Sequence, residues 1–289
     1  MILAQQIISG LATGSLYALA ALGLVLIFKT SDVVNFAQGE MAMFCTFVAF
    51  TLLTTAGLPY FGAFLLALVF AAVFGAALER VVLRPLSKAP LISVLIATLG
   101  LYQIINGVAG WIWGYEMQPF PEPIAGAPIN VGGVVFTLSN LVNISVALAV
   151  MLLFFLLFKY SMLGVAMRAV AENRTVAKLM GVPTDRVLAL TWGLGGILAA
   201  TAGILIAPVT NLDINMMASM QIKAFTAAVL GGFTSLPGAV VGGLALGVLE
   251  NLVGQWNSQL QTPFAFGLIV LVLIVRPGGL LGTIQKKKV

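Results

Sequence analysis

Long blocks without a charged side chain dominate the sequence. They include residues 1–28, 41–78, 89–115, 123–158, 187–212 and 224–249. A helix that crosses the hydrocarbon core of a membrane needs about 20 apolar residues, so each block holds one or two such helices. The blocks are too long and too continuous for the alternating strands of a membrane β-barrel. The pattern therefore predicts an all-α integral membrane protein, a polytopic helical bundle that forms one transmembrane domain over residues 1–289.

The block limits and turn residues predict individual helices. Those with clear bounds are expected at residues 6–28, 38–56, 61–83, 91–113, 139–159, 187–207 and 259–276. The stretch 219–253 is interrupted at residues 233–238, which leaves pieces of about 14 and 16 residues that would reach roughly 21–24 Å. This is less than the ~30 Å core. Two tilted spans and two half-helices remain alternatives, so about 8–9 spans, or about 7 plus a re-entrant pair, are expected.

Composition supports a membrane protein and narrows the chemistry. The chain is 61% hydrophobic and 8% charged, whereas soluble domains carry about 25% charged residues. Cys45 is the single cysteine and histidine is absent, so a disulfide within the chain and a His/Cys metal site are excluded. No pair of carboxylates lies within one helical turn, and no set of catalytic residues is recognisable. The sequence thus predicts no metal, no bound cofactor and no enzyme activity.

Basic residues are expected to mark the cytoplasmic side. If the first helix runs inward, every Lys and Arg except Lys223 falls on that side, and the segment 114–138, with Glu116 and Glu122, is external. This places the N-terminus outside and the C-terminus in the cytoplasm, and it explains the net charge of +5 without a nucleic-acid partner. The cytoplasmic residues are Lys29, Arg80, Arg84, Lys88, Lys159, Arg168, Arg174, Lys178, Arg186, Arg276, Lys286, Lys287 and Lys288.

The segment 160–186 is too polar to span and too periodic for a loop. It predicts a short amphipathic helix or helix pair on the cytoplasmic face that ends at Gly181, two residues before Pro183. It would either rest on anionic lipid or dock a cytosolic partner, and composition does not separate these alternatives. The apolar face is expected to hold Ala166, Ala169, Val170, Val176, Ala177 and Met180, and the polar face Arg168, Glu172, Arg174 and Lys178.

Small residues recur at four-residue spacing, which lets helix backbones approach closely in lipid. The three sets are Gly10, Gly14 and Ala18; Gly195, Ala199 and Gly203; and Ala239, Gly243 and Gly247. We expect these faces to serve helix packing.

Several polar residues lie within or beside the apolar blocks. Candidates to line a transport pathway or gate are Asn35, Gln38, Glu40 and Gln103, although each would equally cap or bridge helices. Lys223 and Glu250 have opposite charge and begin and end the interrupted stretch. We expect them at the same depth, near the outer membrane boundary, where they are candidates for an ion pair; the alternative is that each side chain reaches water separately.

Motifs along nearly the whole chain resemble one family, the permeases of branched-chain amino acid importers of the LivH type. They are GLATGSLYALAALGLVLIF (10–28), NFAQGEMAM (35–43), LRPLSKAPLISVLIATLGL (83–101), RAVAENRTVAKLMGVPTDRVLALTW (168–192), KAFTAAVLGGFTSLPGAVVGGLALGVLENL (223–252) and LIVLVLIVRPGGLLG (268–282). The segment 160–186 also resembles the coupling loop with which such permeases contact their ATPase.

The resemblance implies a type II importer fold in the bacterial inner membrane. It implies a second permease subunit, two cytosolic ATPase subunits and an extracytoplasmic solute-binding protein. The chain lacks a G-x-x-x-x-G-K-[ST] motif, so ATP would bind the partner subunits. Urea or short amides remain alternative substrates within the family, and a stand-alone secondary transporter is a further alternative. The residues implied in ATPase coupling are Arg168, Glu172, Asn173, Arg174, Lys178 and Gly181.

Overall fold

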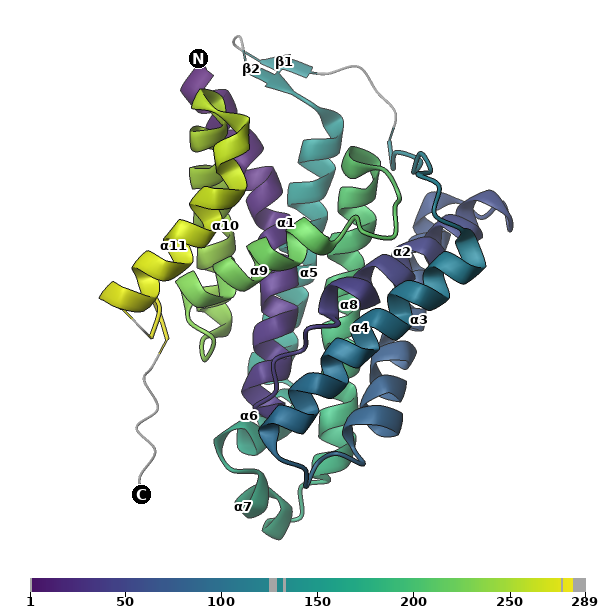
Figure 1. Ribbon diagram of the computed structural model, residues 1–289, viewed down its shortest axis with the longest axis vertical. Helices are drawn as coiled ribbons and strands as arrows, with labels where there is room; N and C mark the ends of the chain where they lie inside the picture. The colour runs from purple at the N-terminus through teal and green to yellow at the C-terminus, as the bar shows by residue number, and fades with distance from the viewer. Residues whose placement is uncertain (1, 125–128, 132–133, 277, 283–289) are drawn as a thin grey trace. The chain divides into compact units, whose positions relative to one another are not determined.

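The computed structural model describes residues 2–124, 129–131, 134–276 and 278–282 (Figure 1). The described chain is mostly helical, which confirms the all-helical prediction at the level of fold class. Its helices are α1 (Ile2–Ser31), α2 (Gln38–Thr54), α3 (Tyr60–Leu78), α4 (Leu91–Trp113), α5 (Leu138–Tyr160), α6 (Met162–Glu172), α7 (Arg174–Leu179), α8 (Thr184–Thr210), α9 (Ala218–Gly231), α10 (Leu236–Trp256) and α11 (Gln261–Val275). A π-helical turn η1 (Glu79–Leu83) extends α3, and a 3₁₀ turn η2 (Ser258–Leu260) precedes α11.

One element departs from an all-helical chain. Two short strands, β1 (Ile129–Val131) and β2 (Val134–Phe136), pair antiparallel with Asn130 opposite Val135. They lie in the segment that the sequence places outside the membrane, where water satisfies the outer edges of a hairpin.

The chain divides into two compact units. Unit 1 comprises Met1–Val25, Glu122–Leu148 and Ser219–Val289, and unit 2 comprises Leu26–Pro121 and Ala149–Ala218.

Seven helical stretches of the described chain are long and apolar enough to cross a membrane. They are Gln5–Ser31, Tyr60–Leu83, Leu91–Trp113, Leu138–Tyr160, Thr184–Thr210, Leu236–Trp256 and Ser258–Val275. Helix α2, with 17 residues, is shorter.

The interrupted stretch differs from the prediction in its second piece. Helix α9 has the expected 14 residues, about 21 Å at 1.5 Å per residue, but α10 has 21 residues and is long enough to span. The prediction stopped at residue 253, where polar residues begin. The helix continues to Trp256, and Asn257 ends it with an extended backbone. The two pieces are therefore unequal, and only α9 has the length of a half-helix.

The two helix ends at this interruption have backbone or side-chain partners. Ser235 caps α10 by accepting a hydrogen bond from the Gly238 N–H at 3.1 Å. The last carbonyls of α9, at Leu230 and Gly231, accept from the N–H groups of Leu280 and Leu281. Because unpaired backbone groups are costly in lipid, the segment after α11 completes the end of α9.

Glycines hold α1 and α10 at backbone contact in unit 1. A Cβ added at Gly10 would lie 2.7 Å from Val248 Cα, and one at Gly243 would meet the Ala18 backbone. Residue numbers rise along α1 as they fall along α10, so the two helices are antiparallel. The packing role predicted for these small-residue faces follows from these contacts.

We expect Gly243→Ala to lower the stability of the protein by about 1–3 kcal/mol, because its methyl group would overlap the backbone of α1. The measurement is the thermal midpoint of the detergent-purified protein. Gly267→Ala in α11 is the matched control, since a Cβ there meets nothing within 4 Å. Equal midpoints for the two variants would contradict the contact.

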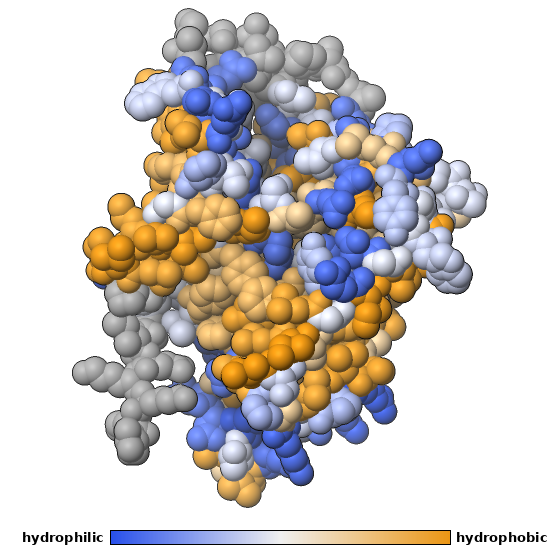
Figure 2. Space-filling model, in the orientation of Figure 1, coloured by the Kyte–Doolittle hydropathy of each residue, from blue (hydrophilic) through white to orange (hydrophobic). Residues whose placement is uncertain are grey.

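Helix α8 forms the centre of unit 2. The carbonyls of Ala71 and Ala72 in α3 approach Gly196 and Gly193 of α8 so closely that no Cβ fits between them. Helix α4, by contrast, presents a row of exposed apolar side chains, among them Ile96 and Ile104, and this apolar surface is visible in Figure 2. A surface of this kind is suited to lipid or to another membrane subunit.

Candidate transport and coupling sites

The segment predicted for ATPase coupling folds as a helix pair, α6 and α7. Ser161 caps α6 by accepting from the Gly164 N–H, and Asn173 caps α7 by accepting from the Val176 N–H, both at 3.0 Å. Gly181, with φ +84°, follows the end of α7. The Val182 N–H donates to the Ala177 carbonyl and the Gly181 N–H to the Lys178 carbonyl, the bonding pattern of a Schellman stop. Each bend of the segment is thus fixed by a local hydrogen bond, from a capping side chain or from the backbone around Gly181.

Two basic residues of this segment are engaged within unit 2. The Arg168 guanidinium donates to the backbone carbonyls of Phe158 and Lys159, at the end of α5. Arg174 forms an exposed ion pair with Asp185 at 3.3 Å. Arg168 therefore braces the helix pair against the end of α5, whereas the Arg174 pair is exposed, as are Glu172 and Lys178.

The expected apolar face of the segment is only partly buried. Val170 and Ala177 are buried, as is Met167, but Val176 and Met180 are 53% and 79% exposed. The prediction allowed a helix pair but assigned all six apolar residues to one face. The extended backbone of Asn173 resets the helical phase, so α7 turns a different face outward. Val176, Leu179 and Met180 form an exposed apolar patch on α7, which we call the α7 tip.

The start of α2 holds two of the pathway candidates, both buried. The Asn35 carboxamide accepts from the Ala37 N–H at 3.1 Å and donates to Gln38 Oε1 at 3.2 Å. Gln38 Nε2 in turn donates to the Gly195 carbonyl of α8 at 3.0 Å. The two side chains attach the beginning of α2 to the backbone of α8.

Glu40 has partners that the sequence did not indicate. Its carboxylate accepts from Asn106 Nδ2 at 3.1 Å and also hydrogen-bonds Tyr102, while Asn106 donates to the Ile214 carbonyl. Gln103 is exposed on another face of α4 and does not join this cluster. The spacing of Tyr102 and Asn106, one helical turn apart on the face that carries buried Leu101, Ile105 and Ala109, is the signal that would have identified them.

Lys223 and Glu250 form an ion pair within unit 1, with side chains 15% and 3% exposed. Lys223 Nζ also donates to the Tyr17 hydroxyl at 3.1 Å. Tyr17 lies near the middle of the span Gln5–Ser31, and Glu250 is followed by six further helical residues. The two residues are therefore in contact, and their depth near the outer membrane boundary stays a prediction.

A second polar contact, between two neutral side chains, lies next to Glu250 in the sequence. Asn251 Nδ2 donates to Thr13 Oγ1 at 2.9 Å, which links α10 to α1 beside the ion pair. Unit 1 thus holds two polar contacts between helices, one of Tyr17, Lys223 and Glu250 and the other of Thr13 and Asn251.

No group of three or more His, Cys, Asp or Glu side chains that could hold a metal ion occurs among the described residues, where Cys45 is a buried free thiol. The contacts described for these sites are helix caps, hydrogen bonds between helices and ion pairs.

Comparison with known proteins finds sequence similarity along almost the whole chain. The family model described as branched-chain amino acid transport system / permease component matches residues 6–275. The chain is 35% identical to the high-affinity branched-chain amino acid permease LivH of Salmonella typhimurium, over 99% of this chain and 97% of that protein. It is 35% identical to BraD of Pseudomonas aeruginosa over the same shares, and 30% identical to a probable LivH of Methanocaldococcus jannaschii over 94% and 90%. No solved structure matches. With seven candidate spans and a match along almost its whole length, the chain is a multi-pass inner-membrane protein and belongs to the family of branched-chain amino acid transport permeases.

Proposed function

We propose that the chain is the permease subunit of an ATP-driven importer that moves branched-chain or other hydrophobic amino acids into the cytoplasm. The observation that carries this proposal is the full-length similarity to LivH and BraD, which are both branched-chain amino acid permeases. ATP hydrolysis is assigned to separate cytosolic subunits. A second permease subunit, forming a heterodimer, and an extracytoplasmic solute-binding protein complete the proposed assembly.

The orientation proposed for this subunit has the N-terminus outside and the C-terminus in the cytoplasm. Its support is the basic residues around α6 and α7, together with Lys29 at the end of α1 and Arg84 after η1. The antiparallel packing of α10 on α1 agrees with it, because an inward α1 then requires an outward α10. In this orientation α9 enters from outside and turns back at Gly232 before α10 returns.

The α7 tip is the proposed contact with the ATPase. It is apolar and exposed, it projects from a polar end of unit 2, and its backbone is fixed by the Asn173 cap and the Gly181 stop. An apolar anchor with a polar rim is typical of protein interfaces. The exposed charges of Glu172 and Lys178 would form that rim.

The pathway assignment of Asn35, Gln38, Glu40 and Gln103 stays a prediction. The hydrogen bonds of Asn35 and Gln38 equally suit the structural alternative of attaching α2 to α8. The Glu40 cluster is the stronger candidate for substrate contact, because a buried carboxylate is costly in a membrane span unless it serves a function.

Reconstitution tests the proposal. The chain, its partner permease, the ATPase subunits and the binding protein would be placed in proteoliposomes with ATP inside, and uptake of leucine, valine, urea and acetamide measured. We expect leucine and valine uptake that requires ATP and the binding protein. Uptake of urea or acetamide alone would reassign the substrate, and uptake by the chain without ATPase would indicate a secondary transporter.

A further inference from the structure

A pocket of about 200 Å³ lies in unit 2 beside the coupling segment. Its wall contains the end of α1, the turn η1, the start of α4, and residues of α7 and α8. The volume equals that of about seven water molecules at ~30 Å³ each. It is thus large enough for a small metabolite.

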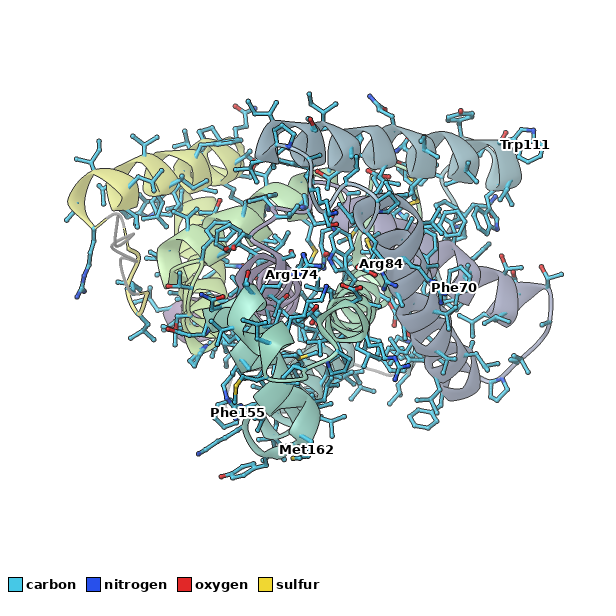
Figure 3. The ribbon with its side chains drawn as sticks, turned by 90° about the horizontal axis from the view of Figure 1, so that it is seen from below. Phe70, Arg84, Trp111, Phe155, Met162 and Arg174 are labelled. Carbon is cyan, nitrogen blue, oxygen red and sulfur yellow. The ribbon has the colours of Figure 1, made fainter. Side chains whose placement is uncertain are left out.

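The charged side chains in the wall are balanced. Arg84 and Arg174 supply two guanidinium groups, and Asp32 and Glu79 supply two carboxylates. Figure 3, which views the molecule from below, labels both arginines. Glu79 already pairs with Arg84 at 2.7 Å, so a zwitterionic ligand would place its carboxylate against the guanidinium groups and its ammonium against Asp32.

Both arginines keep donors for a ligand. Arg84 uses Nε and Nη2 for Glu79 and the Asp185 carbonyl, and the described residues show no acceptor for its Nη1. The ion pair of Arg174 with Asp185 is 41% and 54% exposed. An exposed ion pair of this kind contributes little to stability. Replacing Asp185 by a ligand carboxylate as the partner of Arg174 therefore costs little free energy.

Apart from Ser31 and Ser87, the rest of the wall is apolar. Leu83, Val94, Leu188 and Trp192 line the pocket, and none of them is more than 8% exposed. Their positions are set by the packing of α3, α4 and α8. Charges at the rim with a fixed apolar wall behind them fit a ligand that carries both a zwitterionic head and an aliphatic side chain.

We propose that this pocket is a cytoplasmic binding site for a free hydrophobic α-amino acid, distinct from the transport pathway, through which imported product slows further import. The ligand class rests on the proposed function, since such an amino acid would be the transported product. The bound ligand would join Arg174 of α7 to Arg84 and Asp32 and so hold the helix pair against the body of unit 2. A contact that favours one position of α7 changes the coupling to the ATPase.

Binding is measured by thiol protection in the assembled complex, in detergent. Cys45 is replaced by alanine, and Ser87, which lines the pocket, by cysteine. We expect L-leucine at about ten times its Kd to slow maleimide labelling of Ser87→Cys about tenfold, and L-glutamate to leave the rate unchanged. Lys88→Cys is the matched control, because Lys88 is exposed, adjacent and outside the lining. Equal rates with and without L-leucine at Ser87→Cys, or equal slowing at both positions, overturn the site.

Product inhibition is measured in proteoliposomes preloaded with L-leucine. We expect internal leucine to reduce the initial rate of ATP-driven uptake, and Asp32→Asn to relieve this inhibition. Asparagine keeps the backbone of Asp32, whose φ is +55°, since it tolerates the left-handed region. Inhibition of equal size in Asp32→Asn contradicts the proposal. Absent uptake without internal leucine would instead count against the proposed function, so the two failures are distinguishable.

Discussion

Lys223→Met is expected to destabilise the protein by about 3–5 kcal/mol, a fall of roughly 10 °C in the thermal midpoint. The methionine fills a similar volume but leaves the Glu250 carboxylate buried and without its cation. Glu250→Gln leaves Lys223 in the same position, with the Tyr17 hydroxyl as a neutral partner. Because Lys223 is less deeply buried than Glu250, the loss for Glu250→Gln should be the smaller one.

The double variant separates an ion pair from two independent charges. If the residues interact, Lys223→Met with Glu250→Gln should recover at least half of the stability lost in Lys223→Met. Tyr17→Phe is the matched control: it removes one hydroxyl and should cost about 1 kcal/mol. Uptake measured on the same variants shows whether the pair serves transport as well as stability. Strictly additive losses would show that the two charges act separately.

Gly181→Val is expected to lower the amount of substrate imported per ATP hydrolysed roughly tenfold. Nothing lies within 4 Å of a Cβ at Gly181, so the effect is not steric crowding. The cause is φ +84°, which a β-branched residue adopts only with strain of about 1–3 kcal/mol. Relief of that strain would break the two hydrogen bonds that stop α7 and would shift the α7 tip.

Gly181→Asn is the control for this prediction, because asparagine accepts a positive φ at low cost. It should retain most of the coupling, while ATPase copurification reports whether the complex stays assembled. Continued ATP hydrolysis with little import by Gly181→Val would identify uncoupling. Equal import per ATP for the valine and asparagine variants would show that the Gly181 backbone does not matter.

Features that depend only on local patterns of residues, such as apolar blocks and helix stops, could be predicted from the sequence. Apolar length and the absence of charge located the spans, and the Gly181 and Pro183 pattern located the end of α7. The contact of Lys223 with Glu250 agrees with their opposite charge and their positions in the interrupted stretch. The continuation of α10 to Trp256 could not be predicted, because it passes through polar residues.

Features that depend on side-chain direction could not be predicted. Arg168 returns to the carbonyls at the end of α5, which is visible only when the bend at Ser161 is known. Asn106 was missed and Gln103 was chosen, although they lie three residues apart on α4, since only the packing of α4 decides which side chain faces Glu40. The outward turn of Val176 likewise follows from the break at Asn173.

The contact between α1 and α10 also sets the order of events during synthesis. The glycine face of the first helix, at Gly10 and Gly14, is covered by residues that follow it by about 230 positions. At about 5–20 residues per second, the ribosome supplies them on the order of 10–50 s later. Throughout that time the native partner of this face is absent. Unit 1 therefore completes its folding after translation is nearly finished, and a chain truncated before α10 would leave α1 inserted in the membrane with its packing surface uncovered.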